Sequence, residues 1–336
     1  MVAGGDIDKD LILAEGQYPV IANALTGDGI VGYYDKEYRV NAPAVTVTGR
    51  GDVGHAKARL VNFTPVVRLL SVKSEHDVFF LENAINTLKI VIESTGVPQL
   101  TVPQLAKYEV AFPRQLDEEE HIGVFFKQLD HLITLHQRKY DKLTNVKKSM
   151  LEKMFPKNGS NVPEIRFKGF TEAWEQRKLG ELVDVCSGRD YKHLLEGTIP
   201  VYGTGGYMLS VNDALSYDRD AIGIGRKGTI DRPYILKAPF WTVDTLFYAI
   251  PREKVDLNYA FDIFQNIDWK KKDESTGVPS LSKTAINDID VLAPKHDEQQ
   301  IIGQFFAAID NLITLHQREL EKLKNIKKSC LENMFV

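Results

Sequence analysis

The sequence has few of the features that mark secreted, membrane-spanning or metal-dependent catalytic proteins. Its 336 residues include two cysteines, Cys186 and Cys330, which are too few for a disulfide framework and fit a reducing cytosol. The apolar runs are far shorter than a membrane span, and no basic and apolar leader opens the chain, so we expect a cytoplasmic protein. Walker A, HExxH, GxSxG and CxxC runs are absent, so we expect no metal, no cofactor and no catalytic residue in this chain.

An excess of positive charge is also missing. The formal net charge is −4 and the isoelectric point is about 6.1. This balance argues against a protein that holds nucleic acid by bulk charge alone. It leaves room for basic residues concentrated on a few loops, or for a partner that supplies the remaining charge.

What the chain does contain is an internal repeat. Residues 122–155 and 302–335 are identical at 22 of 34 aligned positions, with an offset of 180. The run STGVP occurs at 94–98 and again at 275–279, with an offset of 181. This period is too long for a solenoid and predicts two copies of one module. Each module has a divergent front and a near-constant back, which suggests one binding task performed on two different targets.

The near-constant backs are predicted to be helices. Apolar residues recur every three or four positions, in a stripe that includes Phe125 and Leu132 in the first copy. Acidic residues begin each segment and a lysine pair lies near its end, as the helix dipole favours. We therefore predict helices over 117–155 and 297–336, packed together as an antiparallel coiled coil, in which a stretch of about 36 residues would span roughly 54 Å.

The fronts are predicted to be α/β domains, over 1–116 and 174–296, with a linker over 156–173. The first domain is expected to be incomplete at its N-terminal side, because WEQRKLGEL at 174–182 has no counterpart in it. Apolar patterns predict strands at 44–48, 66–70, 221–224 and 242–250, and helices at 78–92 and 257–267.

Two glycine-rich runs have the formal spacing GxGxxG, at 49–54 and 223–228. A dinucleotide site needs this run between a strand and a helix, and no helical stripe follows either copy. Two interpretations stay open: a plain strand turn, or a functional loop from which an arginine projects. The turns at 94–96 and 275–277 are similarly either structural or phosphate-binding. For the matching histidines 136 and 316, helix packing or partner contact is favoured over a metal or catalytic role.

Basic and aromatic residues near these runs are candidate DNA contacts, because arginine and lysine bind phosphates or guanine edges and tyrosine stacks or hydrogen-bonds. The alternative is that they are only solvated, and the lysines at 270–272 are open to the same two interpretations. The candidates are Tyr34, Arg50, Lys57 and Arg59 in the first module, and Tyr207, Arg226, Lys227 and Arg232 in the second.

Two divergent modules, each followed by a near-identical helix, together with STGVP, LITLHQR and EAWEQRKLGEL, resemble the specificity subunit of type I restriction–modification systems. The resemblance covers almost the whole chain. It implies target recognition domains that each read one half of a bipartite, interrupted target in double-stranded DNA. It also implies helices that set the half-site spacing and dock two methyltransferase subunits, which restriction subunits then join.

The resemblance further implies a non-catalytic chain, with S-adenosylmethionine, ATP and Mg²⁺ bound by the partner subunits. The helix residues expected to face the methyltransferase subunits are Leu132, His136, Arg138, Leu312, His316 and Arg318.

Three other functions fit parts of the pattern: a stand-alone sequence-specific DNA-binding protein, a nucleotide-dependent enzyme, and a purely structural coiled-coil adaptor. The charge balance argues against the first, and the missing helix after each glycine run argues against the second. We expect the isolated chain to bind DNA weakly and with strong salt dependence, because partners supply much of the phosphate neutralisation.

Overall fold

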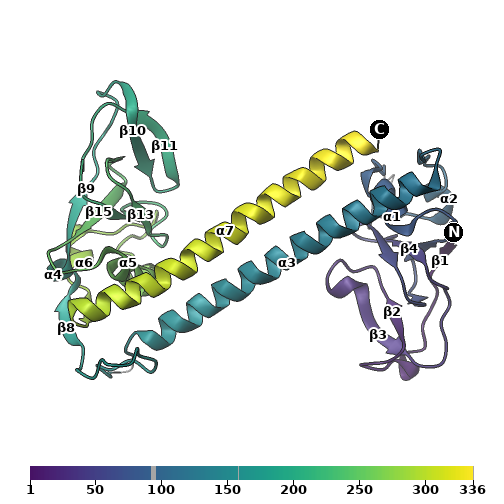
Figure 1. Ribbon diagram of the computed structural model, residues 1–336, viewed down its shortest axis with the longest axis horizontal. Helices are drawn as coiled ribbons and strands as arrows, with labels where there is room; N and C mark the ends of the chain where they lie inside the picture. The colour runs from purple at the N-terminus through teal and green to yellow at the C-terminus, as the bar shows by residue number, and fades with distance from the viewer. Residues whose placement is uncertain (92–95, 158, 336) are drawn as a thin grey trace. The chain divides into compact units, whose positions relative to one another are not determined.

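The computed structural model describes residues 1–91, 96–157 and 159–335 and divides into two units. Unit 1 comprises residues 1–138 and 317–336, and unit 2 comprises residues 139–316. Two long helices, α3 (Leu116–Met154) and α7 (His296–Met334), each contribute one end to unit 1 and the other end to unit 2 (Figure 1). The mixed α/β class is confirmed, and both helices begin one residue before the predicted position.

Unit 2 is built on a four-stranded antiparallel sheet in the order β13-β12-β15-β9. A three-stranded sheet, β11-β10-β14, and a two-stranded one, β16-β8, complete it. The strands are β8 (Glu175–Lys178), β9 (Val183–Ser187), β10 (Glu196–Gly203), β11 (Gly206–Val211), β12 (Ala221–Gly225), β13 (Tyr234–Leu236), β14 (Trp241–Thr242), β15 (Leu246–Pro251) and β16 (Asp290–Ala293). The short helices are α4 (Leu179–Leu182), α5 (Leu257–Asn266), the 3₁₀ helix Trp269–Lys272 and α6 (Lys283–Asn287).

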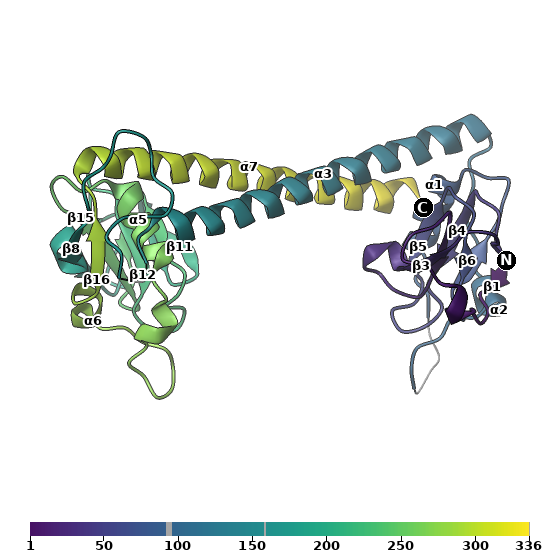
Figure 2. The same cartoon turned by 90° about the horizontal axis from the view of Figure 1, so that it is seen from below.

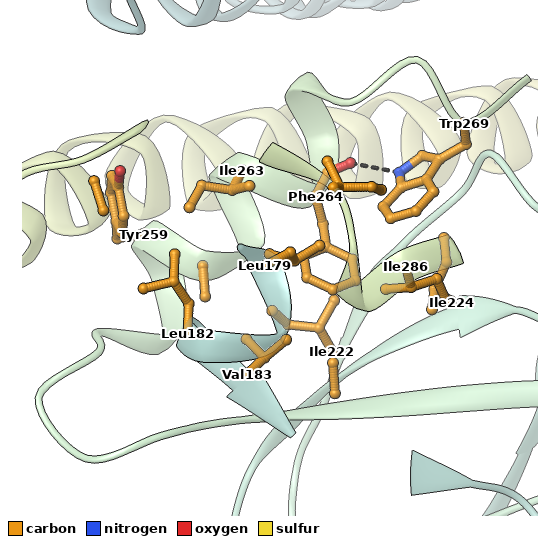
Figure 3. Packing of buried hydrophobic residues seen from close by; sticks show 14 of the residues in the cluster. Leu179, Leu182, Val183, Ile222, Ile224, Tyr259, Ile263, Phe264, Trp269 and Ile286 are labelled. Atoms are coloured by element: carbon orange, nitrogen blue, oxygen red, sulfur yellow. Dashed lines mark hydrogen bonds between the residues drawn. The ribbon is translucent and has the colours of Figure 1, made fainter. Parts of the chain in front are cut away.

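The core of unit 2 lies between α5 and this main sheet. Phe264 from α5 packs with Leu179 from α4 and Ile222 from β12 (Figure 3). The indole of Trp269 joins this cluster and donates to the backbone oxygen of Phe264 at 2.7 Å. Burying aromatic and branched side chains of this size supplies most of the driving force for folding.

Unit 1 repeats this plan with shorter elements. Its main sheet has the order β1-β7-β4-β5, and its second sheet has the order β3-β2-β6. Helix α1 packs against β4 and β5, as Figure 2 shows. The elements are β1 (Val2–Ala3), the 3₁₀ turns Lys9–Leu11 and Gly27–Gly29, β2 (Tyr18–Ile21), β3 (Ile30–Tyr34), β4 (Ala44–Val47), β5 (Ala56–Arg59), β6 (Thr64–Pro65), β7 (Leu70–Val72), α1 (Val78–Thr87) and α2 (Val102–Leu105).

The repeat in the sequence is therefore a repeat in the fold. The order β1-β7-β4-β5 matches β9-β15-β12-β13, and in each three-stranded sheet the middle strand has one antiparallel and one parallel neighbour. The helices α1 and α5 begin alike, because the carboxylates of Asp77 and Asp256 accept backbone N–H groups at their first turns. In both units a helix glycine, Gly123 or Gly303, allows close approach of that aspartate.

The long helices pair antiparallel in each unit, as predicted. In unit 1, Lys327 near the end of α7 binds Asp130 near the start of α3, with Nζ–Oδ1 at 2.6 Å. In unit 2, Lys147 of α3 binds Asp310 of α7, with Nζ–Oδ2 at 2.6 Å. These two ion pairs are related by the repeat offset, so the same helix contact is made twice.

Part of the predicted apolar stripe is wrong. Phe126 and Leu129 are buried, whereas Phe125 and Leu132 are exposed. A heptad stripe has room for only two of every seven positions at a helix–helix seam, and the extra apolar residues lie outside it.

Three other predicted boundaries also change. The chain turns at Arg68, whose φ of 72° is left-handed, so no strand spans 66–70 and β7 begins only at Leu70. Residues 243–245 separate β14 from β15 within the predicted 242–250 strand. Helix α1 ends at Thr87, and the predicted end at Ile92 lies outside the described residues.

Candidate nucleic-acid interface

The two landmarks that repeat in the sequence meet in space within each unit. In unit 1 the N–H of Gly51 donates to the oxygen of Pro98 at 3.0 Å, and the N–H of Leu100 donates to the oxygen of Gly49 at 2.9 Å. In unit 2, Gly228 donates to Pro279 at 2.8 Å and Leu281 donates to Arg226 at 2.9 Å. We call residues 49–51 and 226–228 the glycine loops. Each is fastened to the residues that follow its STG run.

A left-handed glycine gives each glycine loop its shape. Gly51 has φ of 76° and Gly228 has φ of 92°, a region that residues with a Cβ rarely adopt. The residue before each glycine is exposed and basic, Arg50 in unit 1 and Lys227 in unit 2. The backbone of Arg50 forms an antiparallel β-bridge with Gln99, and the backbone of Lys227 forms one with Ser280. Gln99 and Ser280 occupy matching positions in the repeat. The structural counterpart of Arg50 is therefore Lys227, and not Arg226.

The glycine runs do not have dinucleotide-site geometry. Residues 49–54 fall in the connection from β4 to β5, and residues 223–228 run out of β12 into a loop. In the described part of the chain neither run leads into a helix, so the fold lacks the helix N-terminus that a pyrophosphate needs.

The STG turn of unit 2 is held by a carboxylate. Asp273 accepts N–H bonds from Ser275 at 3.0 Å and Ser280 at 2.9 Å, and these bonds lower the pKa of its carboxyl. A negative charge already fills this turn, which favours the structural interpretation over phosphate binding. Residues 94 and 95 of the matching turn in unit 1 lie outside the described residues.

Three predicted basic residues of unit 2 share the loop between β12 and β13. Arg226, Lys227 and Arg232 are all exposed there. The guanidinium of Arg226 lies 5.6 Å from the ring centroid of Phe247, which supports the side chain from one face. Nearby, Lys270 pairs with Asp231 at 3.0 Å, and this contact lowers the pKa of that carboxyl.

The predicted basic residues of unit 1 fall in two places. Arg50 belongs to the glycine loop, whereas Lys57 and Arg59 lie on β5 and line a cavity of about 450 Å³. Arg59 is half-buried, and its Nε donates to the hydroxyl of Thr46 at 3.0 Å. Burial lowers the pKa of this guanidinium, while the charge of Asp28 opposes the shift. Lys327 of α7, which no sequence pattern singles out, lines the same cavity from far along the chain.

The two predicted tyrosines differ in accessibility. Tyr34 is 3% exposed, and its hydroxyl donates to the backbone oxygen of Asp8 at 3.0 Å, so it braces the segment around residue 8. Tyr207 on β11 is 63% exposed, with its hydroxyl 3.2 Å from that of Ser210. Only Tyr207 presents its ring at the surface.

The LITLHQR run places apolar side chains outside the helix seam at both of its occurrences. Leu132 and Leu135 on α3, and Leu312 and Leu315 on α7, are between 37 and 52% exposed. Spaced three residues apart, each pair lies on one helix face. We call these pairs the leucine patches, one in each unit. The neighbouring Arg138 and Arg318 are exposed, whereas His136 and His316 are half-buried and make contacts of their own.

No group of three His, Cys, Asp or Glu side chains within residues 1–91, 96–157 and 159–335 is placed to hold a metal ion. Over the same residues, none of the helices has the length and apolar character that crossing a membrane requires.

The fold defines a class: a protein of two similar but divergent α/β units, in each of which parts of the same two long helices pair antiparallel. A family described as the type I restriction modification DNA specificity domain matches residues 2–145 and 171–325. The chain therefore belongs to the type I restriction–modification specificity family.

Similar proteins come from Methanocaldococcus jannaschii and Mycoplasma pneumoniae. The specificity subunit of the type I restriction enzyme MjaVIII of Methanocaldococcus jannaschii is 23% identical over 376 aligned positions, covering 97% of this chain and 86% of that one. A Mycoplasma pneumoniae sequence assigned as a type I specificity subunit is 29% identical over 125 residues, 36% of this chain and 34% of its own. The crystal structure of a type I restriction–modification S subunit from M. genitalium superposes with a TM-score of 0.76 at 17% identity, covering 100% of this chain and 93% of that one. This last likeness shows a shared fold.

Proposed function

We propose that each unit reads one half of a bipartite, interrupted target in double-stranded DNA. The observation that carries the proposal is the glycine loop, which recurs with the same hydrogen bonds and an exposed cation in two otherwise divergent units. Membership of a DNA specificity family supports it. A constant loop suits the phosphate backbone, which is the same in every target, while divergent neighbours suit the bases, which differ.

Individual contacts follow from exposure and charge. In this proposal Arg50 and Lys227, which are exposed, bind phosphate or guanine edges, and the exposed Arg226, Arg232, Lys57 and Tyr207 contribute further charge or a stacking surface. Arg59 acts through Thr46 and the cavity, and we assign it a positioning role. Tyr34 is buried, and we leave it out of the interface.

The leucine patches are the proposed docking sites for two methyltransferase subunits. Each unit has an exposed pair of leucines, and the two pairs are related by the repeat offset of 180 residues. Two copies of the same partner could therefore bind, one at each pair. Restriction subunits would then join through the methyltransferase subunits. In this proposal S-adenosylmethionine, ATP and Mg²⁺ belong to the partner subunits, and this chain supplies recognition without catalysis.

The test is a chain whose two units carry the same reading surface. Residues 183–289 are replaced by residues 2–108, which keeps β8, β16 and both long helices. We expect methyladenine mapping in cells, with the methyltransferase present, to show a target whose two halves are identical. Persistence of the original second half-site would disprove reading by separate units.

The DNA affinity of the chain without its partners distinguishes this function from that of a stand-alone DNA-binding protein. We expect the isolated chain to bind DNA weakly, with affinity that falls steeply as salt rises. Tight, sequence-specific binding by the chain alone would favour the stand-alone function instead.

A further inference from the structure

A cavity of about 450 Å³ in unit 1 is lined by basic side chains from two distant parts of the chain. Lys57 and Arg59 come from β5, and Lys327 comes from α7. We call it the β5 cavity. With His55 counted as neutral, its described lining residues carry three cations against one carboxylate, that of Asp28. The volume is typical of small-molecule sites, and the excess of positive charge indicates an anionic ligand.

The guanidinium of Arg59 keeps most of its hydrogen-bonding capacity unused. Its Nε donates to the hydroxyl of Thr46, which is 1% exposed and holds the half-buried arginine in place. Within the described residues, the two Nη atoms of Arg59 have no hydrogen-bond partner. A cation that is partly removed from water without a counter-ion is unfavourable, and a bound oxyanion would relieve that cost. The planar guanidinium suits two oxygens of one such anion.

Three carboxylates lie around the β5 cavity, and in the described part of the chain none forms an ion pair with a cation of β5. Asp130 is bound to Lys327 by contacts of 2.6 and 2.8 Å. Asp28 is exposed, and its charge acts on Arg59 from a distance. Burial raises the pKa of Glu82 on α1, and the charge of β5 only partly opposes that rise. The two cations of β5 therefore keep their capacity to bind a ligand.

Unit 2 has an apolar side chain where unit 1 has Arg59. Arg59 lies opposite Ala44 across the β4–β5 pair, and Leu236 lies opposite Ala221 across the matching β12–β13 pair. Leu236 is fully buried, and a Cβ placed on Gly223 of β12 would lie 3.3 Å from it. The same fold thus accepts tight apolar packing at this place. The cations of unit 1 are therefore not required by the fold, which favours a binding role.

We propose that the β5 cavity binds a phosphate group. The Nη atoms of Arg59 donate to two of its oxygens, Lys57 adds a second cation from the same strand, and Lys327 adds positive charge from α7. The negative charge of Asp28 opposes binding. The site is separate from the glycine loop, and the inference does not rest on the reading of DNA by that loop. Two sources share this chemistry, the DNA backbone and a small phosphate ester, and the experiment separates them.

The test uses the full chain and inorganic phosphate, without DNA or partner subunits. We expect isothermal titration calorimetry at low salt to show saturable binding of one phosphate per chain. Arg59→Leu, which introduces the residue type of the matching position in unit 2, should weaken binding about tenfold, the scale of charge-assisted hydrogen bonds. Lys36→Leu removes an exposed cation of unit 1 outside the cavity lining, and it should leave the affinity within about twofold.

A second variant is expected to gain affinity, which a misfolded chain would not do. Asp28→Asn removes the one carboxylate among the described lining residues and should tighten phosphate binding about threefold, because a like charge no longer opposes the ligand. Glu37→Gln is the matched control, since it removes an equal charge from an exposed position of unit 1 that does not line the cavity. It should leave the affinity within about twofold.

Competition with DNA identifies the source of the phosphate group. If a duplex of mixed sequence displaces phosphate from the unaltered chain, the ligand is the DNA backbone, and if it does not, the ligand is a small phosphate ester. No saturable binding, several phosphates per chain, equal effects of Arg59→Leu and Lys36→Leu, or unchanged affinity in Asp28→Asn would each overturn the proposal. Loss of DNA reading with phosphate binding intact would count against the function proposed above and leave this inference standing.

Discussion

The two units share sheet order, loop hydrogen bonds and helix pairing, yet they bury different polar groups at matching positions. On α1 of unit 1 the buried Asn83 donates its side-chain amide to the backbone oxygen of Phe79 at 2.8 Å. On α5 of unit 2 the matching residue is Asp262, which is also buried, and its Oδ2 has no hydrogen-bond partner. The matching buried position therefore holds a hydrogen-bonded amide in unit 1 and a carboxyl whose Oδ2 has no hydrogen-bond partner in unit 2.

The repeated ion pairs also differ between the units, in how deeply the lysine is buried. The side chain of Lys147 in unit 2 is 11% exposed, and its ammonium lies 5.8 Å from the ring centroid of Phe261. Its counterpart in unit 1, Lys327, is 27% exposed. The lysine of this repeated ion pair is thus more deeply buried in unit 2. The duplicated fold therefore preserves packing geometry more strictly than it preserves the polarity of the packed side chains.

The largest expected effect tests whether the units fold separately. Phe126 in unit 1 and Phe306 in unit 2 are fully buried at matching positions. Replacing either by alanine removes a large side chain from a packed core, at a cost of about 3–5 kcal/mol. We expect Phe306→Ala to lower hydrogen-exchange protection in unit 2 and Phe126→Ala to lower it in unit 1. The exposed Leu132→Ala is the control, and equal loss in both units from one core variant would show that they unfold together.

A smaller effect should separate the two ion pairs. Lys147→Met leaves Asp310 beside the buried Asp262 without a cation, at a cost of about 2 kcal/mol, because unpaired charge away from water is unfavourable. Lys327→Met leaves the more exposed Asp130, at a cost of about 1 kcal/mol or less. Urea unfolding of both variants measures the difference. Equal costs would mean that the two sites are equally hydrated.

The next effect depends on pH. Desolvation raises the pKa of Asp262 well above its ordinary value, while the nearby Lys147 opposes the shift. The folded state therefore holds the proton more tightly, so this group's stabilisation is complete below about pH 4 and is lost as pH rises through the folded pKa. We expect Asp262→Asn to remove that loss and to stabilise unit 2 by about 1–2 kcal/mol at pH 7.

The reciprocal change provides the control for this pH effect. Asn83→Asp should install the same pH dependence in unit 1, because it places a carboxyl at the matching buried position. Thermal unfolding between pH 4 and 8 compares both variants with the unaltered chain. If the advantage of Asp262→Asn did not grow with rising pH, the carboxyl would be ionised and well paired in the folded protein.

Much of the architecture was predictable because its signals are local or repeated. The repeat offset indicated two modules, and helical periodicity placed the starts of α3 and α7 within one residue. The strand predicted at 66–70 does not form, because Arg68 has a left-handed backbone conformation. The pattern of apolar residues gives no information about that backbone angle.

The candidate site was predictable only in part. Arg50 and Lys227 stand beside glycines that recur at matching places, which is a local signal. The cavity lined by Lys57, Arg59 and Lys327 depends on contacts between segments that are distant in the sequence, so no local sequence pattern predicts it. Tyr34 lies in a turn-rich stretch typical of exposed residues, but the segment around Asp8 covers it.

The smallest expected effect tests whether the glycine loops of both units contact DNA phosphate. If Arg50 and Lys227 each contact one phosphate, then Arg50→Ala and Lys227→Ala should each reduce the slope of log affinity against log salt by about one. The assembled complex on its methylated target is the sample, and titration at several salt concentrations is the measurement. Exposed Lys295, already paired with Glu172 at 2.5 Å, provides the control Lys295→Ala, which should leave the slope unchanged. If only one loop variant changes the slope, the two loops share a shape without sharing a contact.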